Sequence, residues 1–198
     1  MRRTQQLLTA AILVAGLAAC ASTPPPSITG ATPAATSTAS NTRHVDVPGF
    51  FSADQPSWWM QASFDTMAIS HAFVPVYFST EAISNPCSRI PATVNCPEYP
   101  VDRLEGNGVL VTWTQRGLGG EQVDWTQGAS ATIGGLAARL VVGPGDAACT
   151  AIGGEREMVG LLRGAQTNWT EMRACYLGPD LEKTEAELHA MLASIQWH

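Results

Sequence analysis

Two glutamates and one histidine are the side chains in this sequence that could carry out acid–base chemistry. Glu155 and Glu157 are separated by one residue, so on an extended strand their carboxyl groups would lie on one face. Two carboxyl groups about 5–9 Å apart could cleave a glycosidic bond. His71 lies in the apolar stretch 67–78 and could act as a base. We favour the structural interpretation of all three, a solvated strand and a hydrogen-bonded histidine, and predict no catalytic residue.

Motifs for nucleophiles, phosphate groups and metals are absent from the sequence. It contains no G-x-S-x-G, S-x-x-K, H-E-x-x-H or P-loop pattern. It has no C-x-x-C pair, and none of its 4 histidines stands at ligand spacing from a cysteine. We therefore expect no metal and no cofactor, and we favour a protein without enzymatic activity.

Four of the 5 cysteines lie in the body of the chain. Cys87, Cys96, Cys149 and Cys175 form an even set, which in an exported protein predicts two disulfides. Of the three ways to pair four cysteines, we favour the one with Cys87–Cys96 and Cys149–Cys175. The first disulfide would close a proline-rich loop, and the second would join two strand regions. The two closed loops would contribute about 2.7 and 3.5 kcal/mol in the chain-entropy model.

The remaining cysteine, Cys20, ends an amino-terminal segment with the order of a secretory signal peptide. Two arginines precede an apolar run from Leu7 to Ala19, which is shorter than the roughly 17–25 residues of a membrane-spanning helix. A cysteine directly after two alanines is similar to the lipobox of bacterial lipoproteins. That resemblance implies a signal peptide over residues 1–19, cleavage before Cys20, and acylation of its thiol and new amino group. An ordinary cleavage site with an incidental cysteine is the alternative.

A change in composition after Cys20 indicates a linker and then a domain. Residues 21–42 are almost entirely Ala, Ser, Thr, Pro and Gly, a composition too poor in apolar side chains to fold. We assign residues 20–44 to the acylated cysteine and a flexible linker that spans about 25 Å. Residues 45–198 have the length of one globular extracytoplasmic domain with its own core.

The charge balance limits the partners of this domain. Without residues 1–19 the chain keeps 9 basic and 17 acidic side chains, a formal net charge of −8. This balance argues against nucleic acid and against anionic membrane surfaces as partners. We expect contact with the membrane through the lipid on Cys20 alone, at the extracytoplasmic face of the cell membrane.

Apolar periodicity predicts an α+β fold, a single domain of mostly antiparallel sheet packed with a carboxyl-terminal helix. We expect strands within 67–78, 109–113 and 131–142, the last bent or bulged at Gly134-Gly135, and a hairpin of 156–163 with 168–176.

The helix is expected to begin at Thr184, which forms a capping box with Glu187. Its apolar stripe consists of residues at i, i+3, i+4 and i+7, and a short strand follows it. The stripe is Leu188, Met191, Leu192 and Ile195.

Trp58 and Trp59 are the residues with a possible role in ligand binding. Adjacent side chains on an extended strand point to opposite faces, so we expect at least one of the two to face solvent. Exposed aromatic rings can stack on sugars, dock acyl chains or contact partner proteins. We nevertheless favour the interpretation in which both rings pack beneath a neighbouring loop.

Three segments carry a resemblance to known proteins: 134–138 (GGLAA), 172–180 (MRACYLGPD) and 191–195 (MLASI). Their order resembles small lipoproteins of high-GC Gram-positive bacteria and the PsbP-like α+β fold. The resemblance implies an antiparallel sheet with helices on its faces, as in binding and assembly proteins, and no catalytic residues.

Two functions of different classes remain. We favour a membrane-anchored, non-catalytic module that binds a cell-envelope component or a partner protein, which includes an assembly factor for an envelope machine. The alternative is a small envelope hydrolase that acts on glycan or ester bonds through Glu155, Glu157 or His71.

Overall fold

Two antiparallel sheets and two helices contain most of the residues that the structure describes. The computed structural model describes residues 41–64, 72–88, 99–116, 123–164 and 169–198, all within one unit, Ala39–His198. The elements in chain order are β1 (Thr42–Val47), β2 (Phe51–Pro56), β3 (Met60–Ala62), β4 (Ala72–Ser79), β5 (Val109–Arg116), β6 (Ala129–Ile133), β7 (Leu136–Pro144), α1 (Ala147–Ala151), β8 (Arg156–Arg163), β9 (Trp169–Tyr176), α2 (Leu181–Ser194) and β10 (Gln196–Trp197).

The larger sheet has seven strands in the order β3-β4-β5-β9-β8-β7-β6, and the smaller has the order β1-β2-β10. All of their strand pairs are antiparallel. The domain is therefore α+β and rich in antiparallel sheet, with the carboxyl-terminal helix that the sequence predicts. A second helix, α1, was not predicted.

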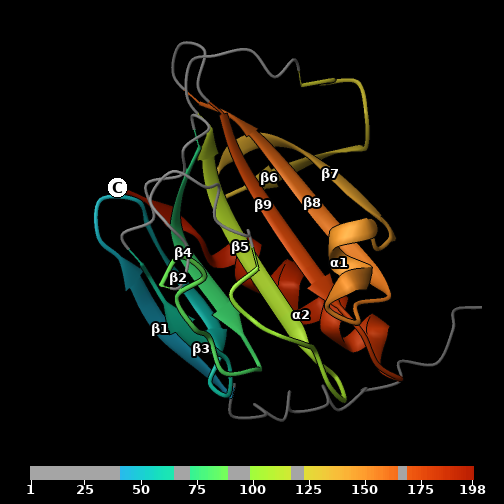
Figure 1. Ribbon diagram of the computed structural model, residues 1–198. Helices are drawn as coiled ribbons and strands as arrows, with labels where there is room; N and C mark the ends of the chain where they lie inside the picture. Colours follow the sequence, from blue (N-terminus) through green and yellow to red (C-terminus); the bar gives the residue numbers. More distant parts are fainter. Residues whose placement is uncertain (1–40, 65–71, 89–98, 117–122, 165–168) are drawn as a thin grey trace, which may run out of the picture. The chain divides into compact units, whose positions relative to one another are not determined.

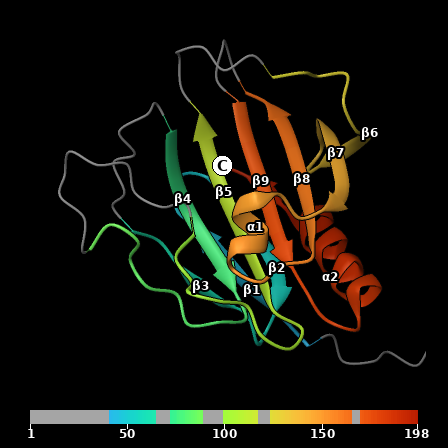
Figure 2. The ribbon, with the colours of Figure 1, turned by 45° about the vertical axis from the view of Figure 1, so that its right-hand side comes forward.

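One face of the seven-stranded sheet, called the first face here, carries the main hydrophobic core. Alternate residues of β5 and β9, such as Trp113 and Met172, have no exposed surface and lie directly opposite each other. The smaller sheet and α2 cover this face, and they are tied together where the Asp54 amide donates to Ser194 Oγ at 2.8 Å. Figures 1 and 2 show α2 and α1 on opposite sides of the large sheet.

The other face, called the second face, carries a smaller core under α1. Leu110 and Cys175 pack there with Cys149 and Ile152 from α1 and its end. Leu104, from the segment before β5, joins them, and its amide donates to the Ile152 carbonyl at 2.8 Å. Only part of the second face is apolar, which leaves the rest to polar and charged side chains.

Three boundaries differ from those predicted from the sequence. α2 begins at Leu181, with Asp180 as its N-cap, because Leu181 packs against the main core and draws the first turn into the helix. Thr184 is consequently a buried residue within the helix and does not cap it. β1 begins at Thr42, within the segment assigned to the linker.

The third difference concerns Gly134-Gly135. The two glycines have φ values of 55° and 81° and form a two-residue turn between β6 and β7. Positive φ at both positions matches the twist of the flanking strands, so the predicted bent strand is a hairpin.

Candidate binding surface

Trp58 and Trp59 lie in the turn between β2 and β3 and point in opposite directions. Trp59 is 1% exposed and belongs to the main core, whereas Trp58 is 48% exposed. The turn is fixed by the Trp59 carbonyl, which accepts hydrogen bonds from the side chains of Arg43 and the buried Gln55. One tryptophan is therefore a core residue, and the other is held at the surface by a rigid turn.

A cavity of about 470 Å³ lies at the start of α2, next to Trp58. Lys183 connects the two features, since it lines the cavity and its Nζ lies 6.0 Å from the centroid of the Trp58 ring. The cavity has the size of a small-ligand site. Its lining residues are Arg156, Pro179, Asp180, Leu181, Glu182 and Lys183.

The charges around this cavity balance. Arg156 and Lys183 oppose Asp180 and Glu182, so the lining has no net formal charge. Several charged groups beside an exposed aromatic ring offer hydrogen bonds without favouring a ligand of either sign. This arrangement suits a neutral, polyhydroxylated ligand such as a sugar.

One wall of the cavity is held in place by a partly buried hydrogen-bond network. The Arg156 Nη2 lies 3.2 Å from Glu185 Oε1, and the Tyr176 hydroxyl donates to the same oxygen at 2.9 Å. Burial raises the pKa of Tyr176, and its hydrogen bond to Glu185 raises it further. The phenol therefore stays protonated and continues to orient Glu185, which in turn orients Arg156.

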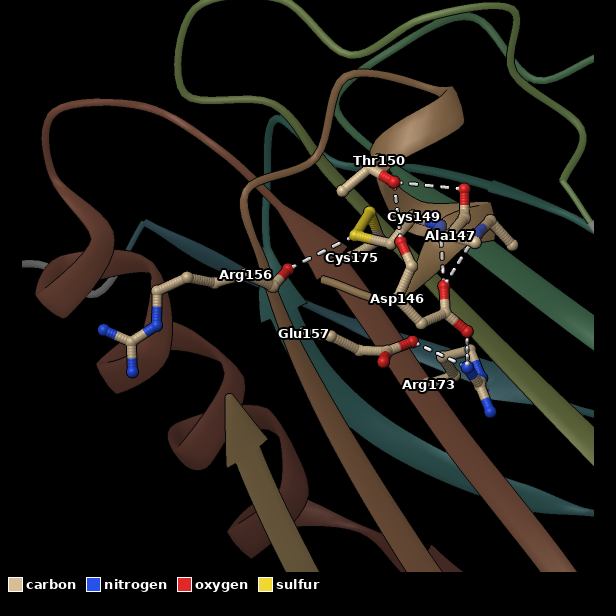
Figure 3. The surroundings of a disulfide bond; sticks show 9 residues. Asp146, Ala147, Cys149, Thr150, Arg156, Glu157, Arg173 and Cys175 are labelled. Atoms are coloured by element: carbon tan, nitrogen blue, oxygen red, sulfur yellow. Dashed lines mark hydrogen bonds and ion pairs between the residues drawn. A yellow bond between two sulfur atoms is a disulfide. The ribbon is translucent and has the colours of Figure 1, made fainter. Parts of the chain in front are cut away.

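A second cluster of charges lies on the second face beside α1 (Figure 3). Arg173 Nη1 is 2.7 Å from Asp146 Oδ2 and 2.8 Å from Glu157 Oε1, and its Nε is 3.1 Å from Glu171 Oε1. Asp146 also caps α1 by accepting hydrogen bonds from the amides of residues 148 and 149. This one carboxylate therefore couples the helix to the charged residues of the sheet.

Burial and neighbouring charges act in opposite directions on the pKa values of this charged cluster. The pKa of Glu157 is raised because its burial outweighs the attraction of Arg173. Burial alone would lower the pKa of Arg173, but the charges of Glu171 and Glu157 overcome this effect and raise it. Glu157 is thus a carboxyl group whose pKa burial raises even though it lies 2.8 Å from Arg173 Nη1.

The disulfide Cys149–Cys175 holds α1 against β9, two residues from Arg173. This is the pairing favoured from the sequence. Cys87 is also disulfide-bonded, and Cys96, its expected partner, lies outside the described residues. Cys20 lies outside them as well.

The structure separates the residues named as possible acid–base groups. Glu155 precedes β8 and is exposed, whereas Glu157 is buried against Arg173, so the two glutamates do not share one environment. His71 lies outside the described residues. Among the residues that the structure does describe, no group of three or more His, Cys, Asp and Glu side chains could hold a metal ion.

Reasoning from the sequence alone did not identify Asp146, Arg173 or Lys183 as site residues. The register of the β8–β9 hairpin, in which Arg173 is directly opposite Val159 and Glu157 is opposite Cys175, could have indicated the charged cluster. Nothing in the sequence places Lys183 near Trp58, because that contact joins segments far apart along the chain.

Comparisons with known proteins return no relative of this chain. No protein-family model, no curated protein and no solved structure matches it. Within the described part of the chain, no helix is both long and apolar enough to span a membrane.

Proposed function

We propose that this protein is a lipoprotein, anchored in the cell membrane through an acylated Cys20, with its domain on the extracytoplasmic side. The lipobox-like Ala-Ala-Cys order and the polar linker after it support this proposal. The disulfide Cys149–Cys175 is consistent with it, because disulfides persist in oxidising compartments. The antiparallel sheet with a helix on each face supports, as a further proposal, the resemblance to PsbP-like domains.

Replacement of the cysteine tests the anchor. Cys20→Ala should leave an uncleaved precursor or release soluble protein, while Ser22→Ala should remain in the membrane fraction. The measurement is the mass of the mature amino terminus in each fraction. Membrane-bound Cys20→Ala with a normally processed terminus would refute the anchor.

For the domain we propose a non-catalytic role, the binding of a carbohydrate component of the cell envelope at Trp58 and the adjacent cavity. The single observation that carries this proposal is the exposed Trp58 ring, fixed beside a charge-balanced cavity of about 470 Å³. The faces of sugar rings stack on aromatic side chains, and their hydroxyl groups donate hydrogen bonds to carboxylates such as Asp180 and accept them from guanidinium groups such as Arg156.

Calorimetric titration with soluble glycan fragments of the cell wall tests this role, using the full chain in a neutral detergent. Trp58→Ala should weaken binding about tenfold, and Trp58→Phe should retain most of it because an aromatic face remains. Leu136→Ala is the matched control, since Leu136 is 46% exposed on a different strand. Equal affinity of the Trp58→Ala and wild-type proteins would rule out this site.

A hydrolase remains the second candidate, because Glu157 has a raised pKa. Glu157 shares Arg173 with Glu171 and Asp146, and a carboxyl group with a raised pKa among other carboxylates could donate a proton to a leaving group. Glu157→Gln should then abolish the release of reducing ends or free acid from envelope substrates while leaving glycan affinity unchanged. A module that only binds would show no release in either protein.

A further inference from the structure

Arginine and tryptophan alternate across one end of the second face, at the ends of the strands opposite the disulfide. Arg163 of β8 is directly opposite Trp169 of β9, and Trp169 is directly opposite Arg116 of β5. The Arg116 guanidinium lies 5.4 Å from the Trp169 ring centroid, and that of Arg163 lies 4.8 Å from the Trp125 ring centroid. The arginine side chains and tryptophan rings of neighbouring strands, together with Trp125 before β6, thus form one row.

Trp125 is held in place by Arg139. The Arg139 Nε donates to the Trp125 carbonyl at 2.7 Å, and its Nη1 donates to Ser130 Oγ at 2.8 Å. These bonds fix the turn before β6 to the neighbouring strand β7. Trp125 is therefore already positioned for its ring to stack against the Arg163 guanidinium.

The charges of Arg139 and Arg163 are not neutralised by ion pairs. Within the described residues, no carboxylate lies within 4.0 Å of either guanidinium, whereas Arg173 alone contacts three. Asp124, next to Trp125, turns its carboxylate toward Thr126 and Gln127, which donate hydrogen bonds to it. This corner therefore carries uncompensated positive charge in a mature chain whose net charge is −8.

We propose that Arg163, stacked on Trp125 and backed by the charge of Arg139, binds an oxyanion group, phosphodiester or carboxylate, of an anionic polymer of the cell envelope. A guanidinium that stacks on an aromatic ring keeps its in-plane N–H groups free for bidentate contacts with an oxyanion. The stacking also lowers the ordering entropy that a free side chain would lose on binding.

A flexible polymer fits this corner better than a membrane surface does. A flat anionic surface would face the whole acidic domain, whose net charge repels it, while a single polymer strand can contact the basic corner alone. This site is separate from the Trp58 cavity in both its residues and its ligand, so it does not depend on the proposed glycan binding.

Binding measurements on the full chain in neutral detergent micelles test the proposal. The probes are linear polyphosphate, polyglutamate and, for protein from which the detergent has been removed, vesicles of neutral lipid with and without added anionic lipid. Wild-type protein should bind one or both polymers, with an affinity that falls as salt is added. Arg163→Gln, which keeps a planar side chain without charge, should weaken binding about tenfold, and Arg163→Lys should weaken it severalfold because the bidentate contact is lost.

Arg103→Ala is the matched control, since it removes the same charge from an exposed residue outside this corner. It should reduce binding by less than twofold. Equal losses for Arg163→Gln and Arg103→Ala would show that only the net charge matters and would overturn the proposal. Stronger binding to anionic than to neutral vesicles without binding to either polymer, or no binding of folded wild-type protein to either polymer, would also overturn it.

Discussion

The two faces of the seven-stranded sheet are built on different principles. The first face is almost wholly apolar and is closed by the smaller sheet and α2. The second face has a small core at α1, a disulfide, and the charged cluster of Arg173 with its three carboxylates. Hydrophobic burial is non-directional and tolerates exchange, while disulfides and ion pairs depend on geometry. The first face therefore gives stability to the fold, and the second fixes the positions of particular groups.

The largest effect is expected from a truncation in the first face. Trp113 has no exposed surface, and its ring lies 4.9 Å from that of Phe51 and 5.8 Å from that of Trp197, centroid to centroid. Trp113→Ala should lower the free energy of unfolding by about 4 kcal/mol. Urea denaturation measures this change, and Trp58→Ala, at the surface, should cost about 0.5 kcal/mol or less. Similar losses from the two variants would contradict the assignment of the first face as the main core.

On the second face, the most sensitive position is Gly154. A Cβ atom there would collide with the sulfur atoms of both Cys149 and Cys175, so Gly154→Ala must displace the disulfide or α1. We expect a loss of about 3 kcal/mol. Gly143→Ala is the control: it lies on the same face in β7, has no atom within 4 Å of an added Cβ, and should cost about 0.5 kcal/mol or less.

A double-mutant cycle shows whether this loss acts through the disulfide. In a chain with Cys149→Ala and Cys175→Ala, the added Cβ at Gly154 meets no sulfur atom. The cost of Gly154→Ala should then fall by more than half. An unchanged cost would mean that the glycine is needed for another reason.

The first face was also the more predictable of the two. Val109, Val111 and Trp113 share the first face as their alternation predicts, although the residues between them are buried on the second face as well. The apolar stripe of α2 is also present and buried. α1 could not be found in this way, since its five residues have no apolar period and depend on the Asp146 cap and on the bond from Cys149 to a distant strand.

The candidate binding surface was predictable only in part. Adjacency on a strand indicated that at least one of Trp58 and Trp59 could face solvent, and Trp58 does, although the two residues lie in a turn. The favoured interpretation, in which both rings pack beneath a loop, is wrong for Trp58. Their surroundings come from long-range contacts, such as that of Lys183 with Trp58, which no local pattern encodes. The same holds for Arg163 on Trp125, where the pairing of β7 with β8 brings the two side chains together.

The smallest expected effect is on the pH dependence of stability. It can be followed at two carboxyl groups, one on each side of the sheet. Burial raises the pKa of Glu157 on the second face and of Glu187 on α2, from 4.5 in each case. A raised pKa means that the folded state holds its proton more tightly than the unfolded state. Each group therefore favours folding below about pH 4.5, and this contribution is lost as the pH rises through the folded pKa.

Glutamine keeps the shape of the protonated carboxyl group and does not titrate. Relative to wild type, Glu157→Gln and Glu187→Gln should both gain stability as the pH rises from 4.5 through the folded pKa. The Glu157→Gln gain should be the larger, because the Glu157 side chain is 10% exposed and that of Glu187 is 21% exposed. Urea denaturation at a series of pH values measures these gains. A larger gain for Glu187→Gln would contradict this ranking, and a loss of stability for Glu157→Gln as the pH rises would mean that Arg173 stabilises the Glu157 carboxylate more strongly than burial destabilises it.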